Sequence, residues 1–221
     1  LGHVLHTARR LLPKKIIVVI GHGADRVRKA FAGDASKPAI DWVLQDPPLG
    51  TGHAVQQAAG RLAADQPTLV LYGDVPLIRE HTLSRLIDAA QASAGKMALL
   101  TASLDDPHGY GRIVRDKANR MTGIVEEKDA STSVKAISEI NTGIMELPTR
   151  SLAQWLKNLK TKNAQGEYYL TDVIAMAVRD GVPIRSAQAR HEHEILGVNS
   201  RDQLAGLERQ LQRQRANALL D

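Results

Sequence analysis

Two oxygen-bearing side chains, Asp74 and Asn199, each follow an apolar stretch of the chain. Asp74 lies in LVLYGDVPL (69–77) and Asn199 lies in LGVNS (196–200). Open α/β sheets place ligands at the carboxyl ends of their strands, and an ionised carboxylate buried there needs a hydrogen bond or a cation. Two such oxygens, with phosphate oxygens and water, can complete an octahedral Mg²⁺ site. An Asx turn in which Asp74 binds the backbone near Pro76 explains the local sequence equally well.

The segment LGTGHA (49–54) has the composition of a nucleotide contact. Its two glycines at the expected start of a helix would leave backbone N–H groups open to a planar base or an anion. Gln45, at the end of the preceding expected strand, adds a side-chain amide that can pair with a base edge. Glycine-rich helix starts are common, so this segment alone is weak evidence.

The segment GHGAD (21–25) begins like a dinucleotide-binding loop but does not complete the pattern. The third glycine of G-x-G-x-x-G would fall at Arg26, where close packing of helix on sheet is required. We therefore expect a tight turn with Asp25 as the N-cap of the next helix.

The segment HEHEI (191–195) resembles a metal cluster in composition only. In a strand, His191 and His193 would share one face and the two glutamates the other, so zinc would receive only two imidazoles. A solvated edge strand is the favoured interpretation.

Strand and helix patterns alternate along the chain with short connections, which is typical of a doubly wound sheet. Expected strands cover 14–23, 41–45, 68–74, 96–104, 109–116, 121–129, 136–147, 183–189 and 191–198. Expected helices begin at 25 and cover 50–63, 81–92, 151–160, 168–181 and 201–220. The sequence therefore predicts an α/β fold with a Rossmann-like, mixed, mostly parallel sheet and a smaller antiparallel insertion over its active edge.

Composition limits the function further. The net charge of +5 could suggest nucleic acid, but only 3% of residues are aromatic, so stacking platforms for single strands are scarce. A mildly positive field suits small polyanions such as nucleotides, so we expect neither a nucleic-acid partner nor a membrane partner. The chain has no cysteine and no apolar run of bilayer length. We expect a cytoplasmic protein.

Seven short motifs together resemble the nucleotide-sugar pyrophosphorylases, and among them the uridyltransferase domain of the bacterial bifunctional N-acetylglucosamine-1-phosphate uridyltransferase/glucosamine-1-phosphate acetyltransferases. The motifs are WVLQDPPLGTGHAV, LVLYGDVPLI, LDDPHGYGRIVR, GIVEEKDA, EINTGI, NAQGEYYLTD and GVNSRDQLAGLE. Each is weak alone, but they occur in the family's order and at its spacings from about residue 42 onward.

The resemblance implies a set of ligand-binding residues. Those placed against the nucleotide are Gln45, Gly50, Thr51, Tyr72, Gly73 and Asp74, with the first three reading the uracil. Those placed against the sugar are Gly111, Glu126 and Asn141, with Tyr169 and Thr171 closing the pocket near the N-acetyl group. Asp74 and Asn199 would form the catalytic Mg²⁺ site. A solvated Glu126 beside Glu127 remains an open alternative, because strand alternation turns only one of the two inward.

The implied reaction needs no protein nucleophile. N-acetylglucosamine 1-phosphate would attack the α-phosphorus of UTP, giving UDP-N-acetylglucosamine for cell-wall synthesis and releasing pyrophosphate. Several negative charges meet at this step, so an Mg²⁺-dependent enzyme would act mainly by positioning and charge neutralisation. Two alternatives remain: another sugar-1-phosphate nucleotidyltransferase, and a non-catalytic module that binds nucleotide sugars.

The resemblance also implies segments on both sides of this chain. The family's L-A-A-G-x-G-T-x-M loop and a following lysine would precede Leu1, so we expect the chain alone to be inactive. Residues 1–199 would form the nucleotidyltransferase domain, and 200–221 a linker helix toward a left-handed β-helix with acetyltransferase activity. Trimers of the family form through that repeat domain, so the full-length protein is expected to be a homotrimer.

Overall fold

A six-stranded mixed sheet forms the centre of the computed structural model, which describes the backbone of residues 1–220 and the side chains of 1–216 and 219. Its strand order is β6-β5-β7-β4-β8, and β3 also pairs with β7. The strands are β3 (Pro67–Val70), β4 (Ala98–Ser103), β5 (Arg112–Arg115), β6 (Met121–Val125), β7 (Glu139–Pro148) and β8 (Arg185–Gln188).

The long strand β7 determines the character of this sheet. It is antiparallel to β3, β4 and β5, while β4 and β8 are parallel. Four strands therefore run in one direction and β7 and β6 run in the other. The predicted mixed α/β fold is confirmed. The sheet is mostly parallel in the sense that four of its six strands share one direction. Most neighbouring pairs in this sheet are antiparallel because β7 lies in its middle.

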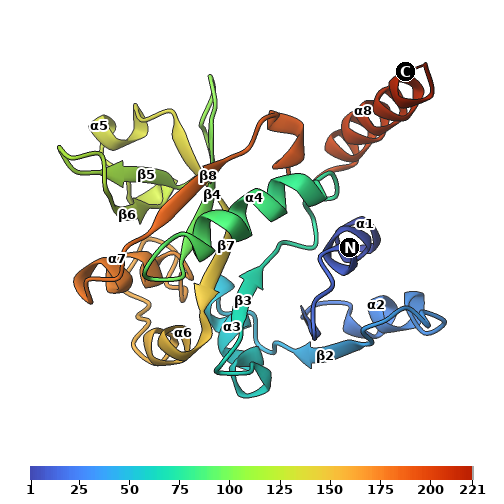
Figure 1. Ribbon diagram of the computed structural model, residues 1–221, viewed down its shortest axis with the longest axis horizontal. Helices are drawn as coiled ribbons and strands as arrows, with labels where there is room; N and C mark the ends of the chain where they lie inside the picture. Colours follow the sequence, from blue (N-terminus) through green and yellow to red (C-terminus); the bar gives the residue numbers. More distant parts are fainter. Residues whose placement is uncertain (221) are drawn as a thin grey trace.

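A separate two-stranded parallel sheet contains β1 (Ile16–Ile20) and β2 (Ile40–Leu44), in register from Ile16 opposite Ile40 to Ile20 opposite Leu44. The first is the β-branched, apolar run IIVVI, and the second, IDWVL, is a short strand that includes Asp41. The helices α1 (Gly2–Arg10) and α2 (Ala24–Ala30) belong to this part of the molecule, on the side of β3 away from β5 and β6 (Figure 1).

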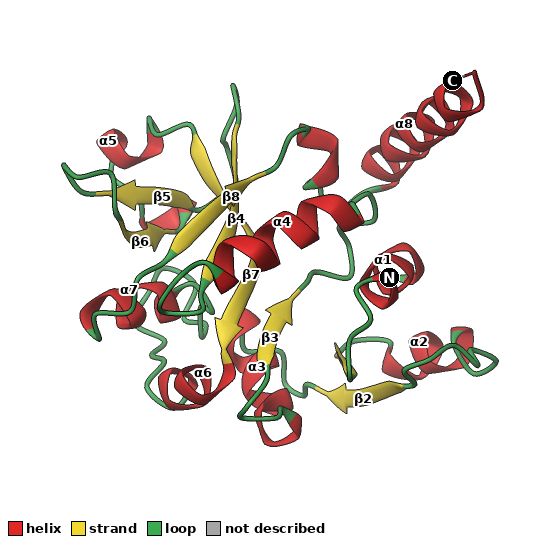
Figure 2. Ribbon diagram, in the orientation of Figure 1, coloured by secondary structure: helices red, strands yellow, loops and turns green. Residues whose placement is uncertain are grey.

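Helices cover both faces of the central sheet, as Figure 2 shows. On one face, Leu100 of β4 joins a buried cluster with Leu86 of α4 (Glu80–Gln91). On the other, Leu99 joins a cluster with Trp155 of α6 (Thr149–Leu156) and Ile174 of α7 (Asp172–Arg179). Successive strand residues face opposite sides, so one short strand contributes to both cores.

The remaining elements are short, except the last. They are α3 (Thr51–Ala58), which continues into the 3₁₀ turn η1 (Ala59–Arg61), the turns η2 (Glu127–Asp129) and η3 (Glu192–Glu194), α5 (Thr132–Lys135) and α8 (Arg201–Leu220). The helix α8 projects from the body of the molecule (Figure 1), although Leu207 near its start is buried. Residue 221, the last of the predicted linker, lies outside the described residues, and the domain boundary at 199/200 stays a prediction.

Two local predictions are wrong. HEHEI forms the turn η3 instead of an edge strand, because Glu194 is fully buried and accepts a hydrogen bond from Thr82. The rings of His191 and His193 stack 5.2 Å apart instead of lying on a strand face. The N-cap of α2 is Gly23, in the left-handed conformation with φ +72°, and Asp25 lies in the first turn of the helix.

None of the helices within residues 1–220 combines the length and the apolar character needed to cross a membrane.

Candidate active site

Asp74 and Asn199 approach each other beside Gly197. A Cβ atom added to Gly197 would lie 3.6 Å from Oδ2 of Asp74 and 3.8 Å from Nδ2 of Asn199. The backbone also joins the two segments, since the N–H of Val198 donates to the carbonyl of Asp74 at 2.9 Å. Both side chains belong to exposed residues. The two polar groups therefore flank one small space that the absence of a Gly197 side chain leaves open.

The route by which Asp74 reaches this space differs from the prediction. The strand β3 ends at Val70, and residues 71–74 form an irregular segment that turns at Gly73 and Asp74. The chain therefore leaves the sheet before it delivers Asp74. The backbone N–H of Val75 donates to the carbonyl of Tyr72 at 3.3 Å, and no hydrogen bond from residues 75–78 to the Asp74 carboxylate occurs among the described residues, so the Asx turn is not formed.

Gln45 lies directly after β2, where its backbone N–H donates to the carbonyl of Ile20 at 2.8 Å. Its side-chain nitrogen Nε2 donates to the carbonyl of Gly50 at 3.0 Å and lies 3.1 Å from Nδ1 of His53. The amide of Gln45 is therefore held by the loop that begins α3.

The glycines of LGTGHA have a packing role that their local sequence did not predict. Gly50 has φ +105°, and a Cβ there would lie 2.7 Å from the carbonyl oxygen of Tyr168. The N–H of Gly52 donates to that same carbonyl at 2.7 Å, and the N–H of Leu170 donates to Oγ1 of Thr51 at 3.1 Å. The two glycines thus allow the loop to pack against residues 167–170, and the N–H of Gly52 is not open to a ligand.

Tyr72 lies between residues predicted to contact the nucleotide and residues predicted to contact the sugar. Burial raises the pKa of its hydroxyl to about 12, and the nearby carboxylates of Glu126 and Asp74 add to the increase. The Thr51 hydroxyl acts in the opposite direction. The ring lies against Gly143, where a Cβ would come within 2.4 Å of Cε2 of Tyr72. Tyr72 therefore stays a protonated phenol at neutral pH, surrounded by candidate site residues.

Glu126 is turned into the site and is not the solvated acid of the alternative interpretation. Its Oε1 accepts a hydrogen bond from Oγ1 of Thr171 at 2.8 Å, and a Cβ on Gly111 would lie 3.1 Å from its Oε2. Burial raises the pKa of Glu126, and Asp129 and Asp172 add to the increase, while the Thr171 hydroxyl lowers it.

The neighbouring Glu127 points elsewhere and pairs with Arg112 at 2.7 Å. The two adjacent glutamates thus face different surroundings, and the site receives only Glu126.

Asn141 lies on β7 beside the same group. Its backbone N–H donates to the carbonyl of Gly111 at 2.8 Å, and its Oδ1 accepts from the N–H of Gly143 at 2.9 Å. The side-chain Nδ2 remains available as a donor. The hydroxyl of Tyr169 accepts from Gln165 at 3.0 Å, whereas the hydroxyl of Thr171 donates to the candidate site residue Glu126.

The predicted residues are thus gathered into one region, but their individual roles stay predictions. Three residues of this region were missed: Gly143, Gly197 and His53. Each lies inside a motif quoted above, but their importance depends on partners far away in the sequence, so local composition gave no signal.

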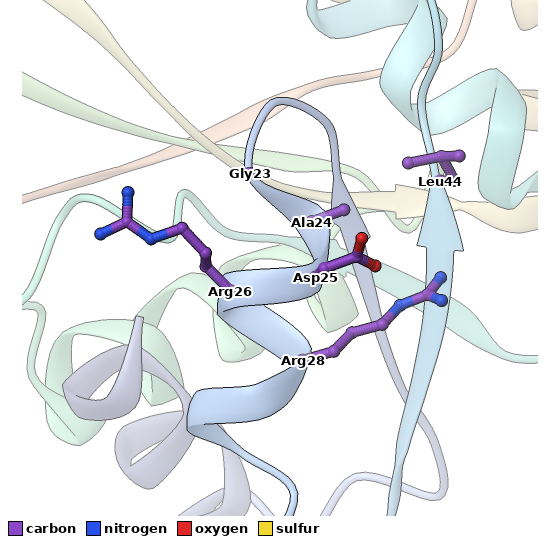
Figure 3. A pocket seen from close by; sticks show the side chains of 6 residues that line it. All are labelled: Gly23, Ala24, Asp25, Arg26, Arg28 and Leu44. Carbon is purple, nitrogen blue, oxygen red and sulfur yellow. The ribbon is translucent and has the colours of Figure 1, made fainter.

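A hollow of about 400 Å³ lies elsewhere, beside α2. Figure 3 shows that the side chains of Arg26 and Arg28 leave this helix in different directions, with Arg28 and Asp25 toward Leu44 of β2. Every charged residue that lines it is exposed. This hollow contains none of the predicted site residues.

Known proteins resemble this chain in sequence and in fold. The family model of the MobA-like NTP transferase domain matches residues 1–140. This chain belongs to that family. Among NTP transferases related to it, the bifunctional protein GlmU of Dechloromonas aromatica is 56% identical over 218 residues, and that of Burkholderia multivorans is 56% identical over 220 residues. The matches cover 99% and 100% of this chain but 47% of each relative, so the chain spans about half their length.

The fold of this NTP transferase is shared with more distant proteins. HddC from Yersinia pseudotuberculosis, solved in complex with GMP-PN, superposes with a TM-score of 0.62 at 16% identity, covering 93% of this chain and 82% of HddC. A second structure of HddC gives a TM-score of 0.58 at 18% identity, covering 83% of this chain and 73% of HddC. At these identities the likeness extends to the fold alone.

Proposed function

We propose that this NTP transferase domain transfers a uridylyl group from UTP to N-acetylglucosamine 1-phosphate, producing UDP-N-acetylglucosamine and pyrophosphate. The observation that carries the proposal is the convergence of Asp74 and Asn199 on the open space beside Gly197. The motif series and the 56% identity to proteins named GlmU support the same substrate pair. In this reaction a phosphate oxygen of the sugar phosphate attacks the α-phosphorus of UTP in line, and pyrophosphate leaves.

The residues beside Gly197 suit a divalent cation. No group of three or more His, Cys, Asp or Glu side chains that could hold a metal occurs within the described part of the chain. Mg²⁺ prefers one or two protein oxygens together with water and substrate phosphates, which matches one carboxylate and one amide. Nδ2 of Asn199 is the amide atom nearest Gly197. The oxygen and nitrogen of a side-chain amide exchange places when the amide turns over, so the oxygen of Asn199 can face the ion. When bound, Mg²⁺ would neutralise charge on the phosphate oxygens.

The remaining residues would bind and orient the two substrates. Gln45 would pair with the base, and Tyr72 would separate the nucleotide from the sugar as a neutral phenol. Glu126 would accept hydrogen bonds from sugar hydroxyls, and Asn141 would donate one through Nδ2. Holding two reactants in line replaces a bimolecular encounter by a positioned one and contributes much of the rate. A cytoplasmic location remains a prediction from composition, and a homotrimeric full-length protein remains a prediction from the resemblance.

Asp74→Asn tests the metal assignment. The change keeps the size of the side chain but removes its charge. A bound metal ion contributes several kcal/mol of charge stabilisation in the transition state. Because Asp74→Asn would weaken the binding of that ion, we expect turnover to fall by about a hundredfold or more. Pyrophosphate release by the full-length protein is measured against Mg²⁺ concentration. Asp88→Asn, on the exposed surface of α4, is the matched control and should leave turnover unchanged. Near-normal turnover of Asp74→Asn would refute the assignment.

A substrate panel tests the chemistry itself. Pyrophosphate release is measured with each of the four nucleoside triphosphates and with several sugar 1-phosphates. UTP with N-acetylglucosamine 1-phosphate should be the preferred pair. Preference for another base or sugar would refute the proposed substrates while retaining nucleotidyl transfer, and binding without any turnover would favour the non-catalytic module.

A further inference from the structure

His53 contacts the side chain proposed to read the base. Its Nδ1 lies 3.1 Å from Nε2 of Gln45, and its Nε2 lies 2.8 Å from Nε2 of Gln57, one turn along α3. The ring also stacks on Tyr168, with centroids 6.1 Å apart and planes 30° apart. His53 is therefore fixed in position from three sides.

The proton positions in this group follow from one unambiguous acceptor. The carbonyl of Gly50 can only accept, so the group of Gln45 that faces it must be the NH₂ end of the amide. The second hydrogen of that NH₂ group points to Nδ1 of His53, which must then accept and carry no proton. A neutral ring has its proton on Nε2 in this case, and Gln57 must offer its amide oxygen there.

Both hydrogens of the Gln45 amide nitrogen are thus engaged within the protein. The only group that Gln45 can offer to a ligand is its carbonyl oxygen, Oε1, which is an acceptor. The complementary base edge is a ring N–H donor such as N3–H of uracil. Cytosine has an acceptor at the same ring position, so two acceptors would face each other.

We propose that His53 is a positioning residue that holds Gln45 with its carbonyl oxygen toward the base, and thereby selects uracil over cytosine. This inference rests on the proposed function, because it takes the ligand to be a pyrimidine nucleotide bound at Gln45. The Gly50 carbonyl provides one anchor for the amide, and His53 provides the second that stops it from rotating. A site built to pair with a donor discriminates strongly against a base that lacks it.

Two substitutions separate the hydrogen bond from the bulk of the ring. His53→Phe keeps a ring for stacking on Tyr168 but has no acceptor. His53→Asn loses the ring but can place its Oδ1 where Nδ1 lies. Phe and Asn have similar helix propensities, so they form a matched pair within α3. His6→Asn, on the exposed part of α1, is the control for the change of residue type.

Steady-state kinetics with UTP and CTP are measured on the full-length protein. We expect His53→Phe to raise KM for UTP about tenfold with kcat little changed, and to lower the UTP over CTP ratio of kcat/KM about tenfold, as an unmade hydrogen bond implies. His53→Asn should recover most of that ratio, and His6→Asn should match the wild type. If His53 had only a structural role, His53→Phe would lower kcat/KM for UTP and for CTP by the same factor. Unchanged selectivity in His53→Phe, or equal loss in both His53 variants, would overturn the proposal.

The tautomer of His53 gives a readout that does not depend on turnover. In a ¹⁵N-histidine spectrum of the wild-type protein we expect His53 as the neutral ring with its proton on Nε2, assigned by its loss in His53→Asn. A proton on Nδ1 would overturn the proposal even if uridylyl transfer occurs. Absent turnover with every nucleotide would instead refute the proposed function, and the tautomer would then still decide whether His53 holds Gln45.

Discussion

Glu146, on β7, is a carboxylate in an apolar setting, and its replacement by glutamine should change how stability depends on pH. The residue is 4% exposed and lies in register between Leu69 of β3 and Ala98 of β4. Its carboxylate has no ion-pair partner among the side chains that the structure describes. Burial raises the pKa of Glu146 from 4.5 to about 7.

The sign and size of the effect follow from proton linkage. When the pKa of an acid is higher in the folded than in the unfolded state, the folded protein is more stable at pH values where the acid is protonated in both states than at pH values where it is ionised in both. That contribution is fully present below pH 4.5 and is lost as the pH rises through about 7. At 1.36 kcal/mol for each pH unit between these values, the free energy of unfolding should fall by at most about 3 kcal/mol across this window.

Urea unfolding of the wild type and of Glu146→Gln at pH 5 and pH 8 measures the effect. The amide is neutral at both values, so the variant should gain stability relative to the wild type at pH 8 and lose most of that gain at pH 5. Glu139→Gln, on the same strand, is a control of opposite sign, because the ion pair with Arg115 lowers the pKa of Glu139. Parallel pH profiles of wild type and Glu146→Gln would refute the reasoning.

Two further substitutions address the site. Gly143→Ala should lower the melting temperature for two reasons. A non-glycine residue at φ +80° costs about 1–2 kcal/mol, and the added Cβ would overlap the ring of Tyr72. An unchanged melting temperature in thermal unfolding would contradict this. Thr171→Val removes the donor that lowers the pKa of Glu126, so KM for the sugar phosphate should rise and its pH dependence should move to higher pH. A change in kcat alone, with the KM profile unmoved, would argue against a sugar-binding role for Glu126.

The fold was predictable where a segment's own pattern matched its surroundings. The apolar run at β1, the amphipathic pattern of α4 and the uninterrupted helix α8 all appear within a few residues of the expected bounds. HEHEI failed because its alternation has the period of a strand, while Glu194 is held by Thr82, 112 residues away. Local sequence contains no information about that partner.

In the candidate site, too, some features could be predicted from local sequence and others depend on distant segments. Asp74 and Asn199 were predicted to meet, and the structure brings them together beside Gly197. The strand-end reason for that prediction was wrong, because β3 ends at Val70 and residues 195–199 form no strand. The use of Gly50 was not predictable, because the residue that requires it to be glycine is Tyr168, far along the chain. A turn glycine and a packing glycine look the same in sequence until the facing segment is known.

The central position of β7 has a consequence for biosynthesis. Within residues 1–220 β3 pairs only with β7, and β4 pairs with β7 and β8, so neither strand pairs with a described residue that precedes it in this chain. Along this chain, the edges of β3 and β4 that pair with β7 stay open until residues 139–148 arrive. Open edges invite intermolecular pairing, and late, long-range pairing slows folding. Pairing of β3 and β4 with β7 therefore waits for the roughly 35 residues between β4 and β7, an interval in which chaperones would protect these edges.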